Sequence, residues 1–384
     1  MSSRWLSDRR LRVALVHSYY SSKQPSGENR VVEQQAAALA GAGHIVEIMS
    51  QRTDDREASR GYRPMVAITV ASGLGPAPLD KISEFRPDIV HVHNLFPNYG
   101  RTWLRRNKVP LVATMHNYRP LCPAATFFRD GRLCTKCLDA KTAVPAVRHG
   151  CYRSRLQTVP VALATKFSDD PVLTNADKIV VINDRMKDLY TSAGVSSDRI
   201  SVVPNFVPAS DVPPVGSGGD YWLYVGRLSA EKGILNIVRS WPDDHRLVVA
   251  GTGGEEAAVR AVASASVNVL GAVTSSEVRS LMAHAVGLIF PSRSMEGLAL
   301  VCLEALAAGT PILAWEPTEA ASAVAAWGVG AVAGTDLAGS LLQAAELFPS
   351  LRNHCREVFD ERFTEEKWLE KTTALYHDAI ASRQ

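Results

Sequence analysis

The sequence has no uninterrupted apolar stretch long enough to cross a bilayer as a helix. The segment Met1 to Arg10 is polar and contains three arginines, and no apolar core of export length follows it. A secretory signal is therefore not indicated. From these absences we expect a cytoplasmic protein, at most peripheral to a membrane.

Net charge is also small, because 42 lysines and arginines face 39 acidic residues, which gives +3. A charge of this size does not argue for a nucleic-acid partner, and we expect none. Basic residues nevertheless gather in two places: Arg101, Arg105, Arg106 and Lys108, and then Arg148, Arg153 and Arg155. The simpler interpretation is a solvated face. The alternative is contact with an anionic membrane surface or a lipid-diphosphate acceptor.

Two common phosphate-binding patterns are missing. No Asp-x-Asp occurs, and adjacent pairs such as Asp54 and Asp55 point in opposite directions on an extended chain. A divalent metal that bridges a diphosphate is therefore not indicated, and we expect no catalytic metal. Gly251-Thr-Gly-Gly254 is rich in glycine, but its spacing does not fit Gly-x-Gly-x-x-Gly.

The chain does have the length and the pattern of a two-domain α/β protein. Its 384 residues, 46% of them apolar and 21% charged, are typical of soluble globular proteins. Apolar strands alternate with helical patterns in both halves, which favours parallel sheets. Residues 208–220 are rich in Pro, Gly, Ser and Asp and predict a linker. We therefore predict domains over 1–207 and 208–363 and a C-terminal helix over 364–384.

The most informative segment follows an apolar strand that ends at Phe290. Glu296 precedes Glu304 by eight residues, and we expect a helix from Leu298 to Ala308. Eight residues at a helical rise span at most about 12 Å, which is close to the reach from sugar to ribose in a nucleotide-sugar.

Between these two carboxylates lie the unpaired N–H groups of the helix start, which attract a diphosphate. The residues at that start are Leu298, Ala299 and Leu300. One carboxylate suits a pair of ribose or sugar hydroxyls, and the other lies where positive charge develops at an anomeric carbon. The segment therefore predicts a nucleotide-sugar site.

A second motif, Gly226-Arg-Leu-Ser-Ala-Glu-Lys-Gly233, directly follows another predicted strand. Arg227 and Lys232 are five residues apart after a tight glycine turn, so both cations can reach one diphosphate. In isolation this is only a loop with two exposed cations. Its combination with the paired glutamates favours a functional interpretation.

These segments together resemble the retaining glycosyltransferases of family 4, which have the GT-B fold. The resemblance implies two doubly wound, Rossmann-like domains that face a cleft, with a C-terminal helix that crosses back to the first domain. The match is collinear from about Leu11 to the C-terminus. The resemblance implies that Arg227 and Lys232 neutralise the leaving nucleoside diphosphate, that Glu296 holds sugar hydroxyls and that Glu304 binds the ribose. Many relatives have Glu-Gly-Phe-Gly where this chain has Glu296-Gly-Leu-Ala, which we interpret as a variation that preserves activity.

Two glycine turns extend the resemblance. Ser26-Gly27-Glu28 opens the first predicted helix, and a glycine lets the backbone approach a ligand where a side chain would collide. Gly27 matches the family loop that faces the donor phosphate. Val273, just after Gly271, matches the position whose backbone contacts the nucleotide base.

His116 follows the predicted strand Leu111 to Met115, at the carboxyl edge where open α/β sheets bind ligands. It resembles the family histidine that approaches the donor sugar. His91 and His93 could be mistaken for a metal pair, since alternate residues share a strand face. Without a third ligand in view, we prefer structural roles for both.

Four of the six cysteines fall within a predicted insert at about 119–165, namely Cys122, Cys134, Cys137 and Cys151. The two-residue gap between Cys134 and Cys137, with one cysteine on either side, favours a structural zinc site. Reduced thiols, a redox disulfide and an iron–sulfur cluster remain alternatives, although a cytoplasmic setting disfavours permanent disulfides. Some family members have a cysteine-rich insert here, which does not identify the metal.

The resemblance thus implies a retaining transferase that uses a UDP- or GDP-sugar. Its acceptor would be a glycan, a lipid-linked molecule or a small molecule, held mainly by the N-terminal domain. Two alternatives are a GT-B nucleotide-sugar epimerase and a non-catalytic sugar-nucleotide-binding subunit. The cation pair and the glutamate pair argue against both.

Overall fold

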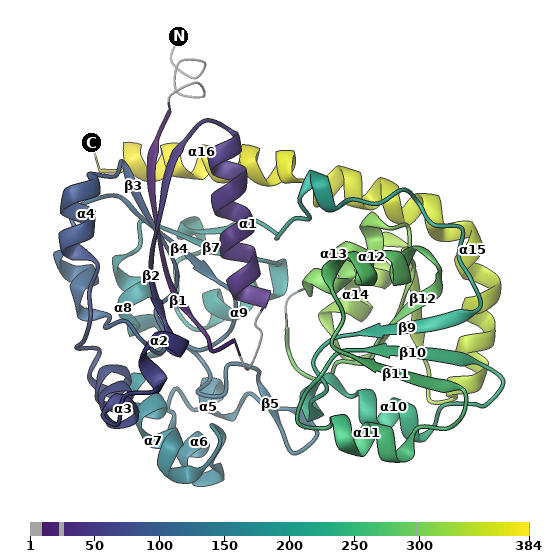
Figure 1. Cartoon of the computed structure of the whole chain (residues 1–384). Helices are drawn as coiled ribbons and strands as arrows, with labels where there is room; N and C mark the ends of the chain where they lie inside the picture. The colour runs from purple at the N-terminus through teal and green to yellow at the C-terminus, as the bar shows by residue number, and fades with distance from the viewer. Residues whose placement is uncertain (1–9, 23–26, 297, 384) are drawn as a thin grey trace. The chain divides into compact units, whose positions relative to one another are not determined.

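The computed structural model describes residues 10–22, 27–296 and 298–383. Two compact units make up the chain, and each is described by itself (Figure 1). The first contains the chain up to Phe127, Thr135–Pro204 and the segment from Trp368 onward. The second contains Phe128–Cys134 and Asn205–Lys367. The main division thus lies between Pro204 and Asn205, whereas the sequence predicted a boundary after residue 207.

The first unit is built on a six-stranded parallel sheet with the order β2-β1-β3-β4-β7-β8. Its strands are β1 (Arg12–Tyr19), β2 (Ile45–Arg52), β3 (Ile89–Asn94), β4 (Leu111–Met115), β7 (Lys178–Val181) and β8 (Ile200–Val202). The central strands are buried almost end to end, since helices cover a parallel sheet on both faces. The strand order reverses between β1 and β3, and ligands bind at such a switch point.

Short helices surround this sheet: α1 (Gly27–Gly41), α2 (Thr53–Glu57), α3 (Tyr62–Ser72), α4 (Leu79–Phe85), α5 (Lys136–Asp139), α6 (Val144–His149), α7 (Arg155–Ala164), α8 (Pro171–Asn175) and α9 (Asp184–Ser192). Several begin where a polar side chain caps the helix. Ser154 accepts from the Gln157 N–H at the start of α7, and Asn183 accepts from the Met186 N–H at the start of α9.

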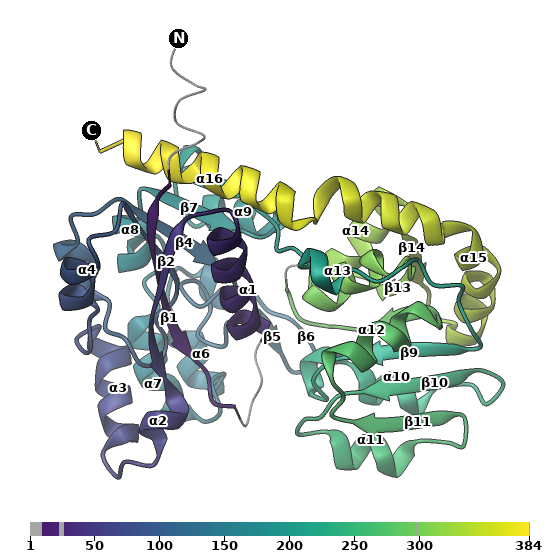
Figure 2. The same ribbon diagram turned by 45° about the horizontal axis from the view of Figure 1, so that its top comes forward.

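The C-terminal helix α16 (Glu365–Ala381) returns to the first unit, as expected (Figure 2). It buries Trp368 and Tyr376, and the Tyr376 hydroxyl lies 2.7 Å from Nδ1 of His91 in β3. Beyond its end, Arg383 Nε lies 2.8 Å from the Asp177 carboxylate.

The second unit repeats the plan with the order β11-β10-β9-β12-β13-β14, all parallel. Its strands are β9 (Tyr221–Val225), β10 (Arg246–Ala250), β11 (Val267–Gly271), β12 (Ala285–Phe290), β13 (Ile312–Trp315) and β14 (Gly330–Ala333). The order reverses between β9 and β12. The two sequence motifs lie in the loops that follow these two strands, so the fold places both at the switch point.

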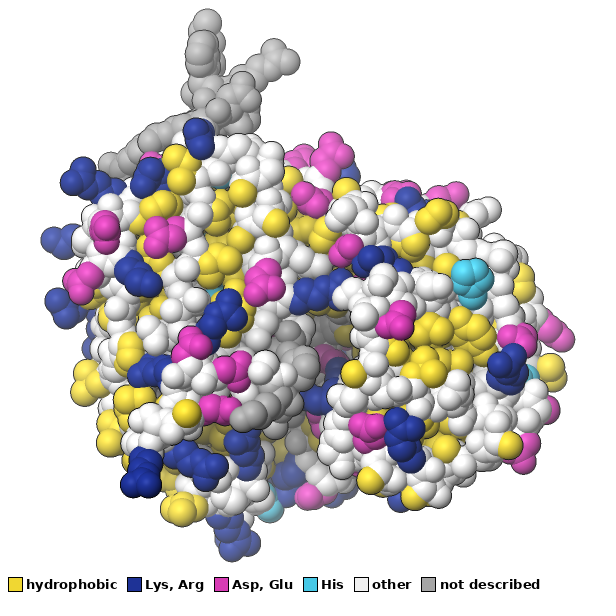
Figure 3. Space-filling view, viewed as in Figure 1, with side chains coloured by type: hydrophobic (Ala, Val, Ile, Leu, Met, Phe, Trp, Pro, Cys, Tyr) yellow, Lys and Arg dark blue, Asp and Glu magenta, His cyan; other side chains and the backbone are white. Residues whose placement is uncertain are grey.

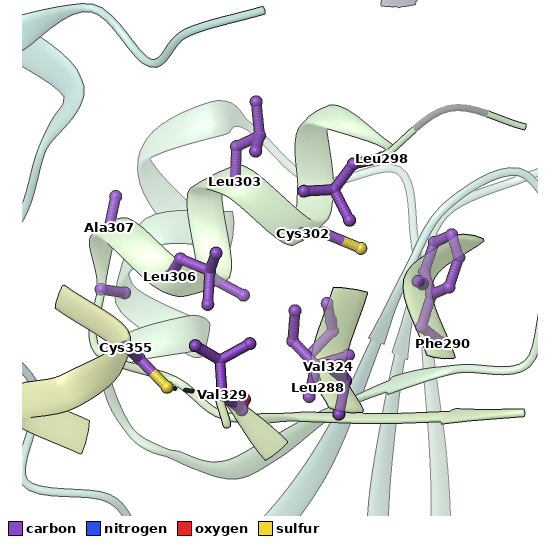
Figure 4. Packing of buried hydrophobic residues seen from close by; sticks show 14 of the residues in the cluster. Leu288, Phe290, Leu298, Cys302, Leu303, Leu306, Ala307, Val324, Val329 and Cys355 are labelled. Atoms are coloured by element: carbon purple, nitrogen blue, oxygen red, sulfur yellow. Dashed lines mark hydrogen bonds between the residues drawn. The ribbon is translucent and has the colours of Figure 1, made fainter. Parts of the chain in front are cut away.

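Its helices are α10 (Ile234–Arg239), α11 (Glu256–Val262), α12 (Ser275–Ala283), α13 (Leu300–Ala307), α14 (Glu319–Trp327) and α15 (Leu337–Arg362). Figure 1 shows α12, α13 and α14 on one face of the sheet and α10 and α11 on the other. Figure 4 shows Cys302 of α13 directed toward Phe290 and Leu288 of β12 within the core of the first of these faces. This packing fixes α13 against the strand whose loop carries Glu296.

A short antiparallel hairpin, β5 (Phe128–Arg129) and β6 (Arg132–Leu133), comes from the predicted insert and groups with the second unit. In the part of the chain that the structure describes, no helix combines the length and the apolar character needed to span a membrane.

Candidate active site

Two loops of the second unit meet at the carboxyl ends of β9 and β12. The Arg293 N–H donates to the Glu231 carbonyl at 2.8 Å, which joins the loop after β12 to the loop after β9. Gly233 makes this contact close: its φ is +75°, and a Cβ there would lie 2.3 Å from the Pro291 carbonyl oxygen. A glycine is therefore required at the point where the two motifs touch.

This contact brings two predicted site residues together, because the Lys232 ammonium forms an ion pair with the Glu296 carboxylate. The other carboxylate oxygen accepts from the hydroxyls of Ser292 and Ser294, the latter at 3.2 Å. About a fifth of each side chain in the pair is exposed, 21% for Lys232 and 23% for Glu296. The carboxylate is thus held by three groups and still reachable from solvent.

Arg227 is more open, with 52% of its side chain exposed, and its guanidinium lies 3.1 Å from the Glu231 carboxylate. The Ser229 hydroxyl donates to the same carboxylate oxygen at 2.7 Å. Below them, the buried Tyr224 hydroxyl donates to the Arg227 carbonyl at 2.9 Å and supports the turn. Arg227 and Lys232 therefore lie on one braced loop, each with a carboxylate partner that an anionic ligand could replace.

Helix α13 begins at Leu300, two residues later than predicted. Ala299 is its N-cap with an extended backbone (φ −64°, ψ 147°), and Leu298 is buried in the loop before it. The methyl side chain of Ala299 cannot accept a hydrogen bond, so the cap leaves the first N–H groups of the helix without a capping oxygen, and these groups suit an anion. Glu304 lies half-buried on this helix, and Gly297 lies outside the described residues.

Glycines also draw together the ends of β9, β10 and β11. The Gly226 N–H donates to the Ala250 carbonyl at 3.0 Å, and the Gly251 N–H donates to the Gly271 carbonyl at 2.7 Å. A Cβ on Gly251 would lie 1.9 Å from the Gly226 carbonyl oxygen. Val273 follows in the loop before α12, half-buried beside this row of turns.

The first unit has its own cluster at the switch-point edge, where His116 contacts His93. Nε2 of His116 lies 3.0 Å from Nδ1 of His93, with the rings stacked. Burial, and next the charge of His17, lowers the pKa of His116 to about 3. Burial also holds the pKa of His93 well below its usual value. Both rings are therefore neutral at pH 7, and His116 acts as a hydrogen-bonding group rather than a cation.

His93 was expected to have only a structural role, and its contact with His116 was not predicted. His93 and His116 end neighbouring strands, which is a signal that sheet order could have supplied. His91, by contrast, uses both ring nitrogens internally, with Tyr376 and Thr114 each at 2.7 Å. That arrangement supports the structural role expected for His91.

The start of α1 is joined to the same cluster. Gly27 is the first residue of α1, and the next residue, Glu28, accepts from Asn117 Nδ2 at 2.5 Å. Asn117 directly follows His116, so the structure brings these two predicted positions into one neighbourhood. Burial raises the pKa of the Glu28 carboxyl. Ser26, the residue before Gly27, lies outside the described residues.

A pocket of about 90 Å³ opens beside these histidines, within the first unit. Its polar lining includes His93, His116, Arg119 and the Arg101–Asp170 ion pair. That pair has an N–O distance of 2.6 Å, and only 3% of the Asp170 side chain is exposed. Arg101 therefore points inward and does not belong to a solvated basic face as the sequence suggested.

The structure does not bring the four insert cysteines together at a metal site. Among the described residues, which include all four, no three His, Cys, Asp or Glu side chains could hold a metal ion together. Cys122 is buried, whereas Cys134, Cys137 and Cys151 are half-buried. Structural zinc stays a prediction, which metal analysis of the purified protein would test.

The two doubly wound parallel sheets, the returning C-terminal helix and the loops at each switch point define a GT-B glycosyltransferase. Two family models match in tandem: "Glycosyltransferase Family 4" over residues 25–211 and "Glycosyl transferases group 1" over residues 211–359. The chain belongs to the family 4, group 1 glycosyltransferases.

One known relative and two solved structures are similar to this chain. A glycogen synthase of Mycobacterium tuberculosis is 25% identical over 352 residues, covering 79% of this chain and 77% of that protein. The sucrose-phosphate synthase of Thermosynechococcus elongatus shares the fold with a TM-score of 0.70 and 19% identity, over 97% of this chain and all of that one. Anabaena HepE, solved with UDP and glucose, has a TM-score of 0.62 at 13% identity, over 96% of this chain and all of that one.

Proposed function

We propose that the protein transfers a sugar from a nucleotide-sugar to an acceptor with retention of configuration. The observation that carries this proposal is the contact of Lys232 with Glu296, braced by Ser292, at the switch point of the second unit. A cation and an oriented carboxylate are adjacent there, just before the first turn of α13. A site that binds a sugar diphosphate needs both a cation for the phosphates and a carboxylate for the sugar.

The donor diphosphate would occupy the start of α13, where the N–H groups of Leu300 and its neighbour offer hydrogen bonds. Lys232 and Arg227 would leave their glutamate partners and neutralise the phosphates, with no divalent metal. Glu304 would bind the ribose, and the backbone at Val273 would contact the base. HepE, which shares this fold, was solved with UDP, and this supports a UDP-sugar, with a GDP-sugar as the alternative.

Charge stabilisation at the leaving diphosphate would be the main contribution to rate. Glu296 would hold sugar hydroxyls and support the oxocarbenium-like transition state. The leaving phosphate itself would help to deprotonate the acceptor on the same face, so no covalent glycosyl-enzyme is needed. Neutral His116 would hydrogen-bond the donor sugar. The acceptor would be a glycan, a lipid-linked molecule or a small molecule.

A thermal-shift panel of UDP, GDP, ADP, dTDP and CMP tests the donor site. A nucleotide that binds only the folded state stabilises it, by about 2.7 kcal/mol at a hundredfold excess over Kd. We expect one nucleoside diphosphate to stand out. The shift should shrink in Lys232→Ala but not in the control Arg239→Gln, which changes an exposed arginine at the end of α10. No shift with any nucleotide would contradict the proposal.

The matching nucleotide-sugar then separates transfer from its alternatives. Product in which the sugar is joined to an added acceptor with its original anomeric configuration supports the proposal. Epimerised donor formed without any acceptor would identify an epimerase instead. Tight binding with no turnover across an acceptor panel would favour a non-catalytic subunit.

A further inference from the structure

An outward face of the first unit concentrates exposed apolar side chains. Thirteen large apolar residues are exposed in the described part of the chain, and seven of them lie on α3, α6, α7 or the residues next to α3. They are Met65, Ile68, Leu74, Val144, Leu156, Val159 and Leu163. The largest exposed fractions are 83% for Leu156 and 69% for Val144. We call this surface the α3–α7 face.

Helix packing explains why this face is uncovered. Helix α3 packs on α7 through Val70, Val161 and Ala164, which are buried against each other. These residues use the inner side of each helix, and the pocket beside His93 and His116 lies beneath them. The outer sides of both helices are still apolar, although soluble helices usually carry polar residues there. Such a patch marks an interaction surface.

The segment 140–168, which forms α6 and α7 of this surface, is basic. Residues 140–168 contain five lysines or arginines and no acidic residue, although the whole chain has a net charge of only +3. These cations are Lys141, Arg148, Arg153, Arg155 and Lys166, and all five are exposed. Helix α3 adds exposed Arg63. Figure 3 shows dark blue and yellow side chains interleaved where α3, α6 and α7 lie in Figure 1.

These cations are available to an external partner. Within the described residues, no ion pair joins any of the five to a carboxylate, whereas Arg101 in the same unit is paired with Asp170. Arg153 lies against the ring of Tyr152, 5.6 Å from its centroid, which leaves its charge uncompensated. The face therefore presents net positive charge and apolar area at once.

We propose that the α3–α7 face docks the protein peripherally on an anionic lipid surface. Apolar side chains enter the boundary between headgroups and acyl chains, and lysines and arginines contact the lipid phosphates. A second copy of the chain fits less well, because a symmetric contact would oppose the same cations. Among the acceptors named above, docking favours a lipid-linked one, a corollary that rests on the proposed function.

Vesicle co-sedimentation of the full chain tests this docking. The probes are vesicles of phosphatidylcholine alone and of phosphatidylcholine mixed with phosphatidylglycerol, at low and high salt. We expect binding to the anionic vesicles that weakens with salt. Arg148→Gln with Arg155→Gln should lower the partition coefficient roughly thirtyfold, about fivefold per cation. Ile68→Ser with Leu156→Ser should lower it at both salt concentrations.

Matched controls lie away from the face. Leu342→Ser with Leu347→Ser removes two leucines of α15 that are 58% and 44% exposed, and Lys81→Gln with Arg239→Gln removes two exposed cations. Neither control should alter vesicle binding. Equal losses in face and control variants would overturn the proposal, as would no binding by the unaltered protein. If the unaltered protein does not bind vesicles and the face variants elute at a different volume in size-exclusion chromatography, the face would be assigned to self-association instead.

Nucleotide-induced thermal stabilisation, measured on the same variants, keeps the two proposals apart. The α3–α7 face belongs to the first unit, whereas Arg227, Lys232 and Glu304, which would bind the nucleoside diphosphate, belong to the second. Face variants should therefore keep the nucleotide shift of the unaltered protein. Lost vesicle binding with a retained shift supports docking through this face, whereas vesicle binding that survives every face substitution rejects it.

Discussion

At the residue scale, Glu296 has specific surroundings. Ser292 and Ser294 orient its carboxylate, and Lys232 supplies an adjacent positive charge. Ion pairs contribute little net stability: about 0 to 1 kcal/mol at the surface, with an added desolvation cost where they are partly buried, as here. Three partners around one half-buried carboxylate are therefore better explained by ligand binding than by stability.

Single substitutions should separate the two glutamates. Glu304→Ala should weaken nucleotide diphosphate binding by roughly ten- to a hundredfold, since a hydrogen bond to a charged group contributes about 1.5–3 kcal/mol. Glu296→Ala should leave that affinity nearly unchanged and lower kcat by a comparable factor, because its carboxylate would act on the sugar. Titration calorimetry with the nucleotide and steady-state kinetics measure the two effects. Unchanged nucleotide affinity in the Glu304 variant would refute its ribose role.

At the element scale, the ends of β1, β3 and β4 gather buried histidines, and this predicts how stability depends on pH. Burial lowers the pKa of His17 to about 4 and of His91 and His116 to about 3. Each pKa is below the unfolded value of about 6.5, so the stabilisation is complete above pH 6.5. This stabilisation is lost as the pH falls from 6.5 toward 3. Each histidine contributes a loss of roughly 1.4 kcal/mol for each pH unit.

Urea unfolding at pH 7, 6 and 5 should therefore show a decline that is shallower in His116→Asn. His284→Asn, an exposed histidine of the second unit, is the control and should keep the original slope. Equal slopes in all three proteins would contradict the assignment of His116 as a buried neutral ring.

The loop after β9 makes a second prediction at this scale. Gly233→Ala should destabilise the protein by about 2 kcal/mol or more, because its left-handed backbone disfavours a side chain and the added Cβ would meet the Pro291 carbonyl. Gly254→Ala is the matched control, since a Cβ there has no atom within 4 Å. Urea denaturation compares them. Equal stability of the two variants would mean that the contact between the loops is loose.

The local sequence pattern predicted the helices and strands, but it did not predict the contacts between them. Runs of apolar residues predicted the strands that end at Phe290 and Met115, since fully buried parallel strands carry that signal. The start of α13 was misplaced because Ala299 adopts an extended conformation, which a helix-forming residue does not reveal. The pairing of His93 with His116 depends on strand order, and the hydroxyl of Ser292 on loop geometry, so neither could be predicted from spacing.

At the scale of the whole molecule, the chain's last helix belongs to the unit that its first strands build. Trp368 and Tyr376 are buried in the first unit, although the residues just before them belong to the second. The GT-B assignment predicted this return, but composition did not, because α16 is an ordinary amphipathic helix. Its anchor is specific: the Tyr376 hydroxyl occupies one nitrogen of His91.

Loss of this anchor should affect the two units unequally. Trp368→Ala should remove about 3–5 kcal/mol of stability, and Tyr376→Phe about 1 kcal/mol or more, since His91 Nδ1 would be left buried without its partner. Hydrogen exchange should show lost amide protection in β3 and β4 and unchanged protection in β12 and β13. Because Arg227, Lys232 and Glu304, which would bind the nucleoside diphosphate, lie in the second unit, nucleotide binding should survive both substitutions. Equal loss of protection in both sheets would instead show that the two units unfold as one.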